Sequence, residues 1–391
     1  MNSDGRVRHG RYQVATVGRE TVRTFIPSAL PPDPPLRLDP LLGLLEEANR
    51  AIGRLDGVAY VLPAPPLFLY SYVRKEALLS SQIEGTQSSF SDLLLFENEA
   101  ASGAPIDDVA EVSCYVAAME HGLARLRDGF PLSARLIREI HEKLLSGNRG
   151  AEKSPGDFRR SQNWIGGTRP GNAAFVPPPP HQVEDHMSDL EKFLHRQDPS
   201  LPTLVKAGLA HVQFESIHPF LDGNGRLGRL LVTLLLCHDG ALREPLLYLS
   251  LHLKANRSRY YQLLQQVRET GDWEAWLEFF LTGVKETAAE ATETARRILV
   301  LFDQDRRRLE TIGHSAASAL RVHQRLQSSP ILSTARAAKE VGLSIPTVAR
   351  AFDHLQRLGI VNEITGRRRG RLFAYVAYLD AMTEGTAPLS R

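Results

Sequence analysis

A run of twelve residues, HPFLDGNGRLGR, occupies positions 218–229 and constrains this chain more than any other stretch. Apolar residues at helical spacing precede the run from Leu204 to Ile217, and a second helical stripe follows it, with leucines at positions 227, 230, 231, 234 and 235. The glycines of its GNG turn let the backbone turn tightly and approach a ligand closely. The sequence therefore predicts two helices joined by a turn of a size that suits a phosphate group.

The turn carries groups that bind anions. The backbone amides of Gly223, Asn224 and Gly225 would point out of the N-terminus of the second helix, where the partial positive charge of the helix favours an anion. Arg226 and Arg229 are three residues apart, so they share one face of that helix. The planar guanidinium groups of these arginines fit phosphate oxygens. We therefore predict a phosphate-binding site.

Two further residues of the run suit chemistry on a phosphate. His218 ends the first helix, and its imidazole can accept a proton near neutral pH. Asp222 offers a hard oxygen ligand, which suits a Mg²⁺ ion that keeps most of its waters and bridges phosphates. The alternative interpretation is a helix-capping loop with a histidine in the core.

The complete run resembles the signature of the Fic (filamentation induced by cAMP) family, HxFx(D/E)GNGRxxR, with every position present. Members of that family transfer AMP from ATP to a hydroxyl group of a target protein. The resemblance implies that His218 is the base and that Asp222 holds Mg²⁺ (or Mn²⁺). It also implies that the turn amides and Asn224 hold the α- and β-phosphates, while Arg226 and Arg229 hold the β- and γ-phosphates.

Composition excludes several other classes. The 391 residues are 42% hydrophobic and 24% charged, which is typical of a soluble globular protein of two to three domains. The net charge of +2 is too small to indicate a nucleic-acid partner for the whole molecule. Two cysteines cannot form a disulfide framework. We expect a cytoplasmic protein without a membrane partner, because the first thirty residues lack an apolar signal core and no apolar run could span a bilayer.

The N-terminal residues lead to a second motif, which lies near position 80. A strand is predicted from Tyr12 to Thr16, followed by a proline-rich extended arm over 26–40 and a short helix from Leu41 to Leu55. The next helix, about 67–85, ends in SSQIEG. Ser80 and Glu84 share a face of that helix.

The SSQIEG segment resembles the inhibitory motif of Fic proteins, (S/T)xxxE(G/N). The resemblance implies that Glu84 pairs with Arg229 and occupies the place of the ATP γ-phosphate. The alternative is an exposed glutamate near a helix end.

A β-hairpin is predicted between two further helical segments. Helices are expected over 107–127 and 131–145, and a helix at 183–194 follows four prolines. Apolar residues flank a Gly/Pro/Asn-rich turn between them, which favours a hairpin. In Fic proteins a hairpin in this place, the flap, holds the target by strand addition; the alternative is a plain surface hairpin. The flap residues are Trp164, Ile165, Gly166, Phe175 and Val176.

The segment 246–262 also resembles Fic proteins, in which it shapes the nucleoside pocket. Asn256 and Tyr260 are therefore candidate adenosine contacts. Helix capping and core packing are the alternative roles for these two residues.

The C-terminal part changes character. A long charged helix or a pair of helices is expected over 286–325, and then helix, turn and helix from Ala335 to Leu358. Two short strands follow, bracketing GRRRGR, so the segment looks like a winged helix that serves DNA binding or protein docking. The candidate DNA-binding residues are Arg350, Arg357, Arg367, Arg368, Arg369 and Arg371.

We therefore predict a mainly α fold: a Fic-type helical bundle with a β-hairpin flap and a C-terminal winged-helix domain. The predicted domains are residues 1–106, 107–285 (catalytic core), 286–325 (connector) and 326–391. The expected function is adenylyl transfer from ATP to a Ser, Thr or Tyr hydroxyl of a target protein, which includes the enzyme itself. The expected partners are this target protein, a second copy in a homodimer, and DNA or a protein at the winged helix. The alternatives are AMP removal, transfer of another phosphate-linked group, and a nucleotide-sensing DNA-binding regulator.

Overall fold

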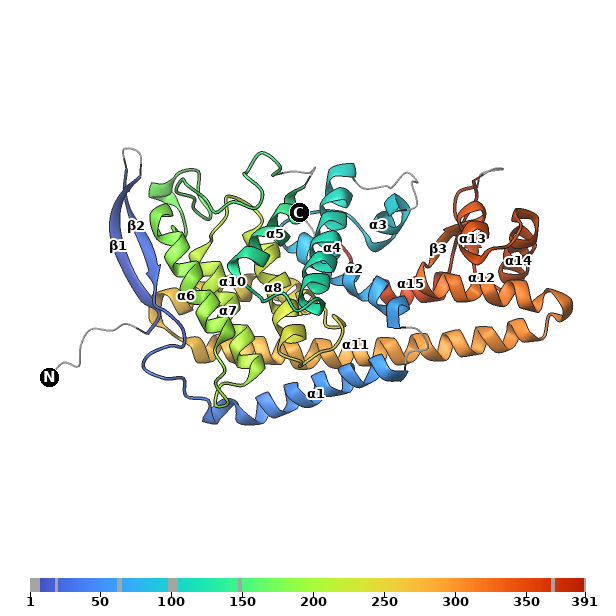
Figure 1. Cartoon of the computed structure of the whole chain (residues 1–391), viewed down its shortest axis with the longest axis horizontal. Helices are drawn as coiled ribbons and strands as arrows, with labels where there is room; N and C mark the ends of the chain where they lie inside the picture. Colours follow the sequence, from blue (N-terminus) through green and yellow to red (C-terminus); the bar gives the residue numbers. More distant parts are fainter. Residues whose placement is uncertain are drawn as a thin grey trace. The chain divides into compact units, whose positions relative to one another are not determined.

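A computed structural model of the chain describes residues 8–17, 20–61, 65–97, 105–146, 150–366 and 370–389 (Figure 1). Helices dominate these residues, as predicted, and the strands form two small sheets. None of the described helices combines the length and apolar character needed to cross a membrane. The helices are α1 (Leu42–Val61), α2 (Pro65–Ile83), α3 (Phe90–Glu97), α4 (Ile106–Arg127), α5 (Ala134–Leu145), α6 (Val183–His195), α7 (Thr203–Ile217), α8 (Asn224–His238), α9 (Ser250–Ala255), α10 (Arg257–Thr270), α11 (Trp273–Glu310), α12 (Ala316–Ser328), α13 (Thr334–Val341), α14 (Ile345–Arg357) and α15 (Val376–Thr383). The strands are β1 (Gly10–Val17), β2 (Glu20–Pro27), β3 (Ile331–Ser333), β4 (Asn362–Glu363) and β5 (Leu372–Ala374).

The chain divides into two compact units. Unit 1 consists of Met1–Gly53, Cys114–Pro245 and His252–Thr287. Unit 2 consists of Arg54–Ser113, Leu246–Leu251 and Ala288–Arg391. Among the described helices, α1, α4, α9 and α11 contribute residues to both units.

Helix α7 is the centre of unit 1. All of its residues from Leu204 to Ile217 are buried, because α8, α6, α10 and β2 pack around it. A helix that is apolar on most of its circumference needs such enclosure. Its polar residues have partners: Lys206, for example, donates a 3.0 Å hydrogen bond to Asp239.

The predicted strand near the N-terminus is one half of a hairpin. Strand β1 pairs with β2 in antiparallel register, from Gly10 opposite Pro27 to Val17 opposite Glu20. The sequence analysis did not predict β2. Its burial does not alternate simply, since Thr24 and Phe25 are both buried, so period-two alternation is weak.

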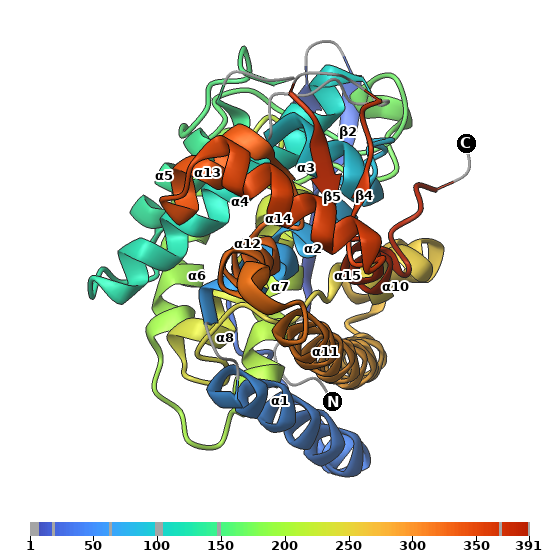
Figure 2. The ribbon, with the colours of Figure 1, turned by 90° about the vertical axis from the view of Figure 1, so that its right-hand side faces the viewer.

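In unit 2, helix α2 packs against α3, α12 and α15. Helix α12 also contacts α13 and α14, and the three strands have the order β3-β5-β4 with antiparallel pairing (Figure 2). Phe352 of α14 stacks on Phe373 of β5, with ring centroids 4.1 Å apart. The predicted helix-turn-helix followed by two strands is thus present in the described residues, with β3 as an additional strand.

Two predicted elements have different extents from those expected. The helix expected from position 286 begins at Trp273, because buried residues continue at helical spacing through the whole of α11. The predicted flap hairpin is reduced to one antiparallel bridge between Ile165 and Phe175. Loop residues and a 3₁₀ turn, Pro170–Asn172, occupy most of the flap.

Candidate active site

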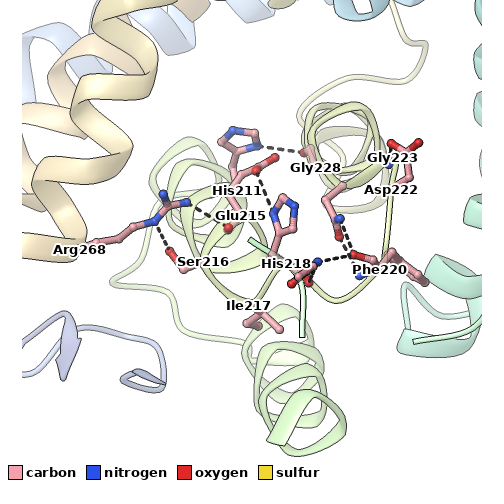
Figure 3. A network of polar contacts seen from close by, with 12 residues as sticks. His211, Glu215, Ser216, Ile217, His218, Phe220, Asp222, Gly223, Gly228 and Arg268 are labelled. Carbon is pink, nitrogen blue, oxygen red and sulfur yellow. Dashed lines mark hydrogen bonds and ion pairs between the residues drawn. The ribbon is translucent and has the colours of Figure 1, made fainter. Parts of the chain in front are cut away.

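The loop between α7 and α8 has two residues in the left-handed backbone region. His218 caps α7 with φ 49° and ψ 61°, and its amide donates to the carbonyl of Phe214. Gly223 precedes α8 with φ 76°, a conformation that glycine adopts readily. These two turns reverse the chain, so His218 and the N-terminus of α8 belong to one short loop (Figure 3).

Side chains hold this loop in place. Asn224 accepts a 2.9 Å hydrogen bond from the amide of Phe220 and donates a 2.8 Å bond to the carbonyl of the same residue. Asn163 donates to that carbonyl as well. The side chain of Asn224 is therefore a structural clamp, which leaves its backbone amide as the group that can face a phosphate.

His141, on α5, holds the loop through a hydrogen bond and a ring stack. Its Nδ1 accepts a 2.8 Å bond from the amide of Gly156, so Nε2 carries the proton and donates to the carbonyl of Asp222 at 3.0 Å. Its ring stacks on Phe220 with centroids 3.7 Å apart. Burial lowers the pKa of His141 to about 4, which keeps the ring neutral. The sequence analysis did not assign it a role.

His218 is held neutral. Its side chain is 16% exposed, and Nδ1 lies 3.9 Å from Oε2 of Glu215. Burial, reinforced by the positive charges of Arg268 and Arg159, lowers the pKa of His218 to about 3. The ring is therefore neutral at pH 7, and one of its nitrogens carries a lone pair that can accept a proton.

Two buried arginines fix the C-terminus of α7, where carbonyl groups lack helical partners. Arg268 donates to the carbonyl of Glu215 at 3.0 Å and to Oγ of Ser216 at 3.3 Å (Figure 3). Arg159 donates to the carbonyl of His218 at 2.9 Å. Sequence reasoning missed both arginines, because their positions, 59 residues before and 50 residues after His218, give no local spacing signal.

The predicted phosphate-binding arginines lie in the first turns of α8. Arg226 and Arg229 are 4% and 3% exposed. Arg226 Nη2 is 3.6 Å from Oδ1 of Asp222, and the same oxygen accepts a 2.6 Å bond from the amide of Gly223. The loop therefore brings together the carboxylate of Asp222, the turn amides and the guanidinium groups of the two arginines.

Asp222 is the metal ligand predicted from the sequence. Its side chain is 40% exposed. Among the described residues no group of three or more His, Cys, Asp or Glu side chains could hold a metal ion. One carboxylate fits Mg²⁺ whose other ligands are waters and substrate phosphates, and it does not fit a metal enclosed by protein ligands.

The flap has one covered side and one open side. Phe175 and Val176 are buried, and the carbonyl of Val176 accepts a 2.9 Å bond from the amide of Phe25 in β2. The guanidinium of Arg268 lies 3.8 Å from the ring centroid of Phe175. Trp164 is 38% exposed and Gly166 is also exposed. Of the predicted flap residues, 164–166 thus form the accessible edge.

The two candidate adenosine contacts differ in burial. Tyr260 is completely buried, and its hydroxyl lies 2.8 Å from Nε2 of His211, whose Nδ1 is 3.0 Å from the carbonyl of Gly228. Tyr260 therefore has the alternative role, core packing. Asn256 is exposed before α10, and its side chain donates to the carbonyl of His252.

The remaining predicted residues belong to unit 2. Ser80 is buried in α2, whereas Glu84 is exposed, one residue beyond the end of the helix, and Gly85 follows with φ 107°. Arg350 and Arg357 are exposed on α14, and Arg371 precedes β5. Arg367, Arg368 and Arg369 lie outside the described residues.

Comparison with known families identifies this arrangement. Residues 131–236 match the model of the Fic/DOC family, and residues 42–124 match that of the Fic/DOC family N-terminal region. The chain contains a Fic domain and its N-terminal region. The matched Fic region contains α5, the flap, α7 and the loop with His218.

Relatives of this chain include enzymes. It is 31% identical over 249 residues to the protein adenylyltransferase Fic of Drosophila grimshawi, covering 63% of this chain and 46% of the relative. It is 31% identical over 251 residues to the protein of the same name from Aedes aegypti, covering 63% of this chain and 44% of that protein. The chain thus spans less than half the length of these curated relatives.

A solved structure shares the fold. A Fic family protein from Desulfovibrio desulfuricans G20 aligns with a TM-score of 0.56 and 20% identity, over 86% of this chain and 96% of that one.

Proposed function

We propose that this chain is a protein adenylyltransferase, which transfers AMP from ATP to a Ser, Thr or Tyr hydroxyl of a target protein. The observation that carries the proposal is the loop between α7 and α8. It places a neutral histidine, one exposed carboxylate, a glycine turn at a helix N-terminus and two arginines within twelve residues. The names of the relatives support the same activity.

The reaction needs a base and an aligned triphosphate. The target hydroxyl oxygen attacks the α-phosphorus of ATP, and its proton passes to His218. The bond between the α-phosphorus and the oxygen that bridges to the β-phosphorus breaks, and pyrophosphate leaves. Catalysis of phosphoryl-type transfer rests mainly on alignment and charge neutralisation.

The loop supplies that alignment. The amides at residues 223–225 would hold the α- and β-phosphate oxygens, that of Gly223 after release of its bond to Oδ1 of Asp222. Arg226 and Arg229 would hold the β- and γ-phosphates. A Mg²⁺ or Mn²⁺ ion bound through Asp222 would neutralise charge on the α- and β-phosphates. The clamp made by the Asn224 side chain keeps the amides in position.

The accessible edge of the flap would hold the target. In an extended segment, the amide and carbonyl groups of successive residues face opposite sides. Those of Ile165 bond to residues 174 and 175, so those of Trp164 face outward, and the chain turns away at Gly166 with φ 68°. An extended target segment can pair with this edge, since β2 already covers the opposite side near Val176.

Glu84 would be the inhibitor of the reaction. Its carboxylate and the γ-phosphate carry the same charge and would compete for Arg229. If the inhibited state is favoured 99 to 1, about 2.7 kcal/mol brings the two states to equal population.

The test is incubation with ATP labelled at the α-phosphate, followed by gel autoradiography. We compare the parent, Glu84→Gly and Glu84→Gly/His218→Ala proteins. Label on Glu84→Gly alone is the expected result, because the substitution removes the inhibitor and the second substitution removes the base. Equal labelling of parent and Glu84→Gly would refute inhibition by Glu84.

The product distinguishes the other reactions of this site. If label appears only with a different phosphate-linked donor, that donor is the substrate in place of ATP. Release of AMP from a modified target, with no labelling of any variant, would assign the site to AMP removal.

A further inference from the structure

The N-terminal hairpin β1–β2 lies beside the flap within unit 1. The amide of Phe25 in β2 donates a 2.9 Å hydrogen bond to the carbonyl of Val176, and the ring centroids of Phe25 and Phe175 are 6.0 Å apart. Five residues earlier in β2, Glu20 contacts the 3₁₀ turn Pro170–Asn172. Strand β2 therefore runs alongside the second half of the flap, from this turn to Val176.

One carboxylate joins the hairpin to the flap. Oε1 of Glu20 accepts a hydrogen bond from Nη1 of Arg169, and Oε2 accepts a 2.8 Å bond from the amide of Gly171. Hydrogen bonds to an ionised carboxylate are stronger than bonds between neutral groups. The bond from Arg169, followed by that from Gly171, lowers the pKa of the Glu20 carboxyl, which is therefore ionised at neutral pH.

A glycine at position 171 makes this contact possible. A Cβ there would lie 2.6 Å from Oε2 of Glu20 and 3.1 Å from Nη1 of Arg169. The backbone of Gly171 does not have the positive φ that favours glycine. Room for the carboxylate is therefore the reason that a side chain does not fit at this position.

The flap has few other contacts that hold residues 168–172, which we call the flap tip. Oδ1 of Asn172 accepts 3.0 Å bonds from the amides of Thr168 and Arg169, and these bonds lie within the tip itself. Among the residues that the structure describes, Glu20 supplies the hydrogen bonds that join the tip to another segment. The position of the tip therefore depends on the hairpin.

Strand β2 is in turn attached to the helix that ends at the proposed base. It packs against α7, and Nε2 of Gln213 donates a 2.9 Å bond to the carbonyl of Ser28, the residue after β2. The guanidinium of Arg268, which lies 3.8 Å from the ring centroid of Phe175, also donates to a carbonyl in the last turn of α7. The hairpin and the flap are therefore fixed to the same end of α7.

We propose that Glu20 is a positioning residue for target binding. It holds the flap tip against the hairpin, so that the accessible edge at 164–166 presents a target segment at the correct distance from His218. A misplacement of about 1 Å can slow an aligned reaction about a hundredfold. The inference rests on the proposed function, because it takes adenylyl transfer as the reaction that needs this alignment.

The hold on the flap is measured in the His218→Ala protein, where transfer plays no part. Glu20→Ala should speed hydrogen–deuterium exchange of residues 165–173 at least about threefold, because the tip loses its external hydrogen bonds. It should also increase acrylamide quenching of tryptophan fluorescence. That quenching reports mainly on Trp164, which is 38% exposed, since the other two tryptophans are 2% and 0% exposed.

The matched control is Glu244→Ala. Glu244 forms a 2.6 Å ion pair with Arg127 outside the flap, and its side chain is 24% exposed, compared with 30% for Glu20. The control should change neither exchange of the flap nor quenching. The midpoint of urea unfolding should change little in both variants, because exposed ion pairs contribute little to stability.

The effect on transfer is measured by self-labelling in the Glu84→Gly background. Glu20→Ala should slow labelling about tenfold through misalignment of the target. The KM for ATP should change less than about twofold, since the flap does not hold the nucleotide. Gly171→Ala keeps the carboxylate but displaces it, so it should slow labelling to a similar extent. The double variant should be no slower than Glu20→Ala, because both substitutions remove the same contact.

Four outcomes decide the proposal. Unchanged exchange and quenching in Glu20→Ala would refute the hold on the flap. Faster exchange with undiminished labelling would refute positioning. Equal slowing by Glu244→Ala, or additive effects of Glu20→Ala and Gly171→Ala, would also overturn it. If Glu84→Gly itself takes no label, the proposed transfer is refuted, whereas faster exchange in Glu20→Ala would still support the hold on the flap.

Discussion

At the scale of single residues, the environment of His218 is the decisive feature. A histidine in water has a pKa near 6.5 and would be partly protonated near neutral pH. Here burial and two guanidinium groups lower the pKa of His218 to about 3. Arg268 and Arg159 therefore have two effects. They hold carbonyl groups at the end of α7, and their positive charges add to the effect of burial in lowering the pKa of the imidazole.

We predict that His218 remains neutral throughout the pH range from 5 to 8. The ring proton resonances of His218 in an NMR titration should therefore show no inflection in that range. An inflection near pH 6.5 would contradict the buried, arginine-flanked site.

We predict that Arg268 is a positioning residue. Arg268→Met removes a charge beside His218 and two hydrogen bonds to α7. The pKa of His218 should rise toward its ordinary value, and labelling in the Glu84→Gly background should fall about ten- to a hundredfold, with little change in the KM for ATP. Arg268→Lys keeps the charge and should restore the low pKa of His218. A purely structural role would leave that pKa unchanged.

At the scale of elements, the packing of α7 against α8 depends on Gly228. A Cβ at this position would lie 2.7 Å from Oε1 of Glu215 and 3.2 Å from the ring of Phe214. The glycine therefore lets the two helices approach closely. This contact sets the distance between His218 at the end of α7 and the arginines at the start of α8.

We predict that Gly228→Ala lowers the free energy of unfolding by about 1–3 kcal/mol, because both neighbours lie in a packed interior. Gly53 in α1 is the matched control, since a Cβ there meets nothing within 4 Å. Gly53→Ala should raise the free energy of unfolding by about 0.5–1 kcal/mol through helix propensity. Urea denaturation followed by circular dichroism measures both. Equal effects of the two substitutions would contradict the close approach of α7 and α8.

At the scale of the whole molecule, several histidines are buried in the neutral form. Burial lowers the pKa of His141, His211 and His323 to about 4, and that of His218 to about 3. In the unfolded chain these groups would bind protons below pH 6.5. Between about pH 4 and 6.5 the unfolded state therefore binds more protons than the native state, and stability rises with pH.

We predict that the free energy of unfolding decreases steadily as the pH falls from 7 to 5. Each histidine contributes a slope of up to about 1.4 kcal/mol per pH unit below its unfolded pKa. Urea denaturation at several pH values measures the slope, which should be shallower in His323→Asn. Stability that is constant over this range would contradict neutral burial of these histidines.

The sequence by itself determined the helices, the loop at 218–229 and the resemblance to the Fic family. These features are local: helical periodicity reports which face of a segment is buried, and the Fic signature places its residues within twelve positions. The loop geometry follows from Gly223 and from the reversal at His218.

The tertiary structure decided how the site is supported. Arg159, Arg268 and His141 reach the loop from positions 50 to 81 residues away, and no spacing rule relates such distances. It also showed that the Asn224 side chain clamps the loop, that β2 pairs with β1, and that Tyr260 is buried. It placed α2, which leads into the SSQIEG segment, in one compact unit with α12, α13, α14 and α15. Local sequence patterns fix periodicity and turns, whereas contacts between distant segments depend on which surfaces pack together once the chain has folded.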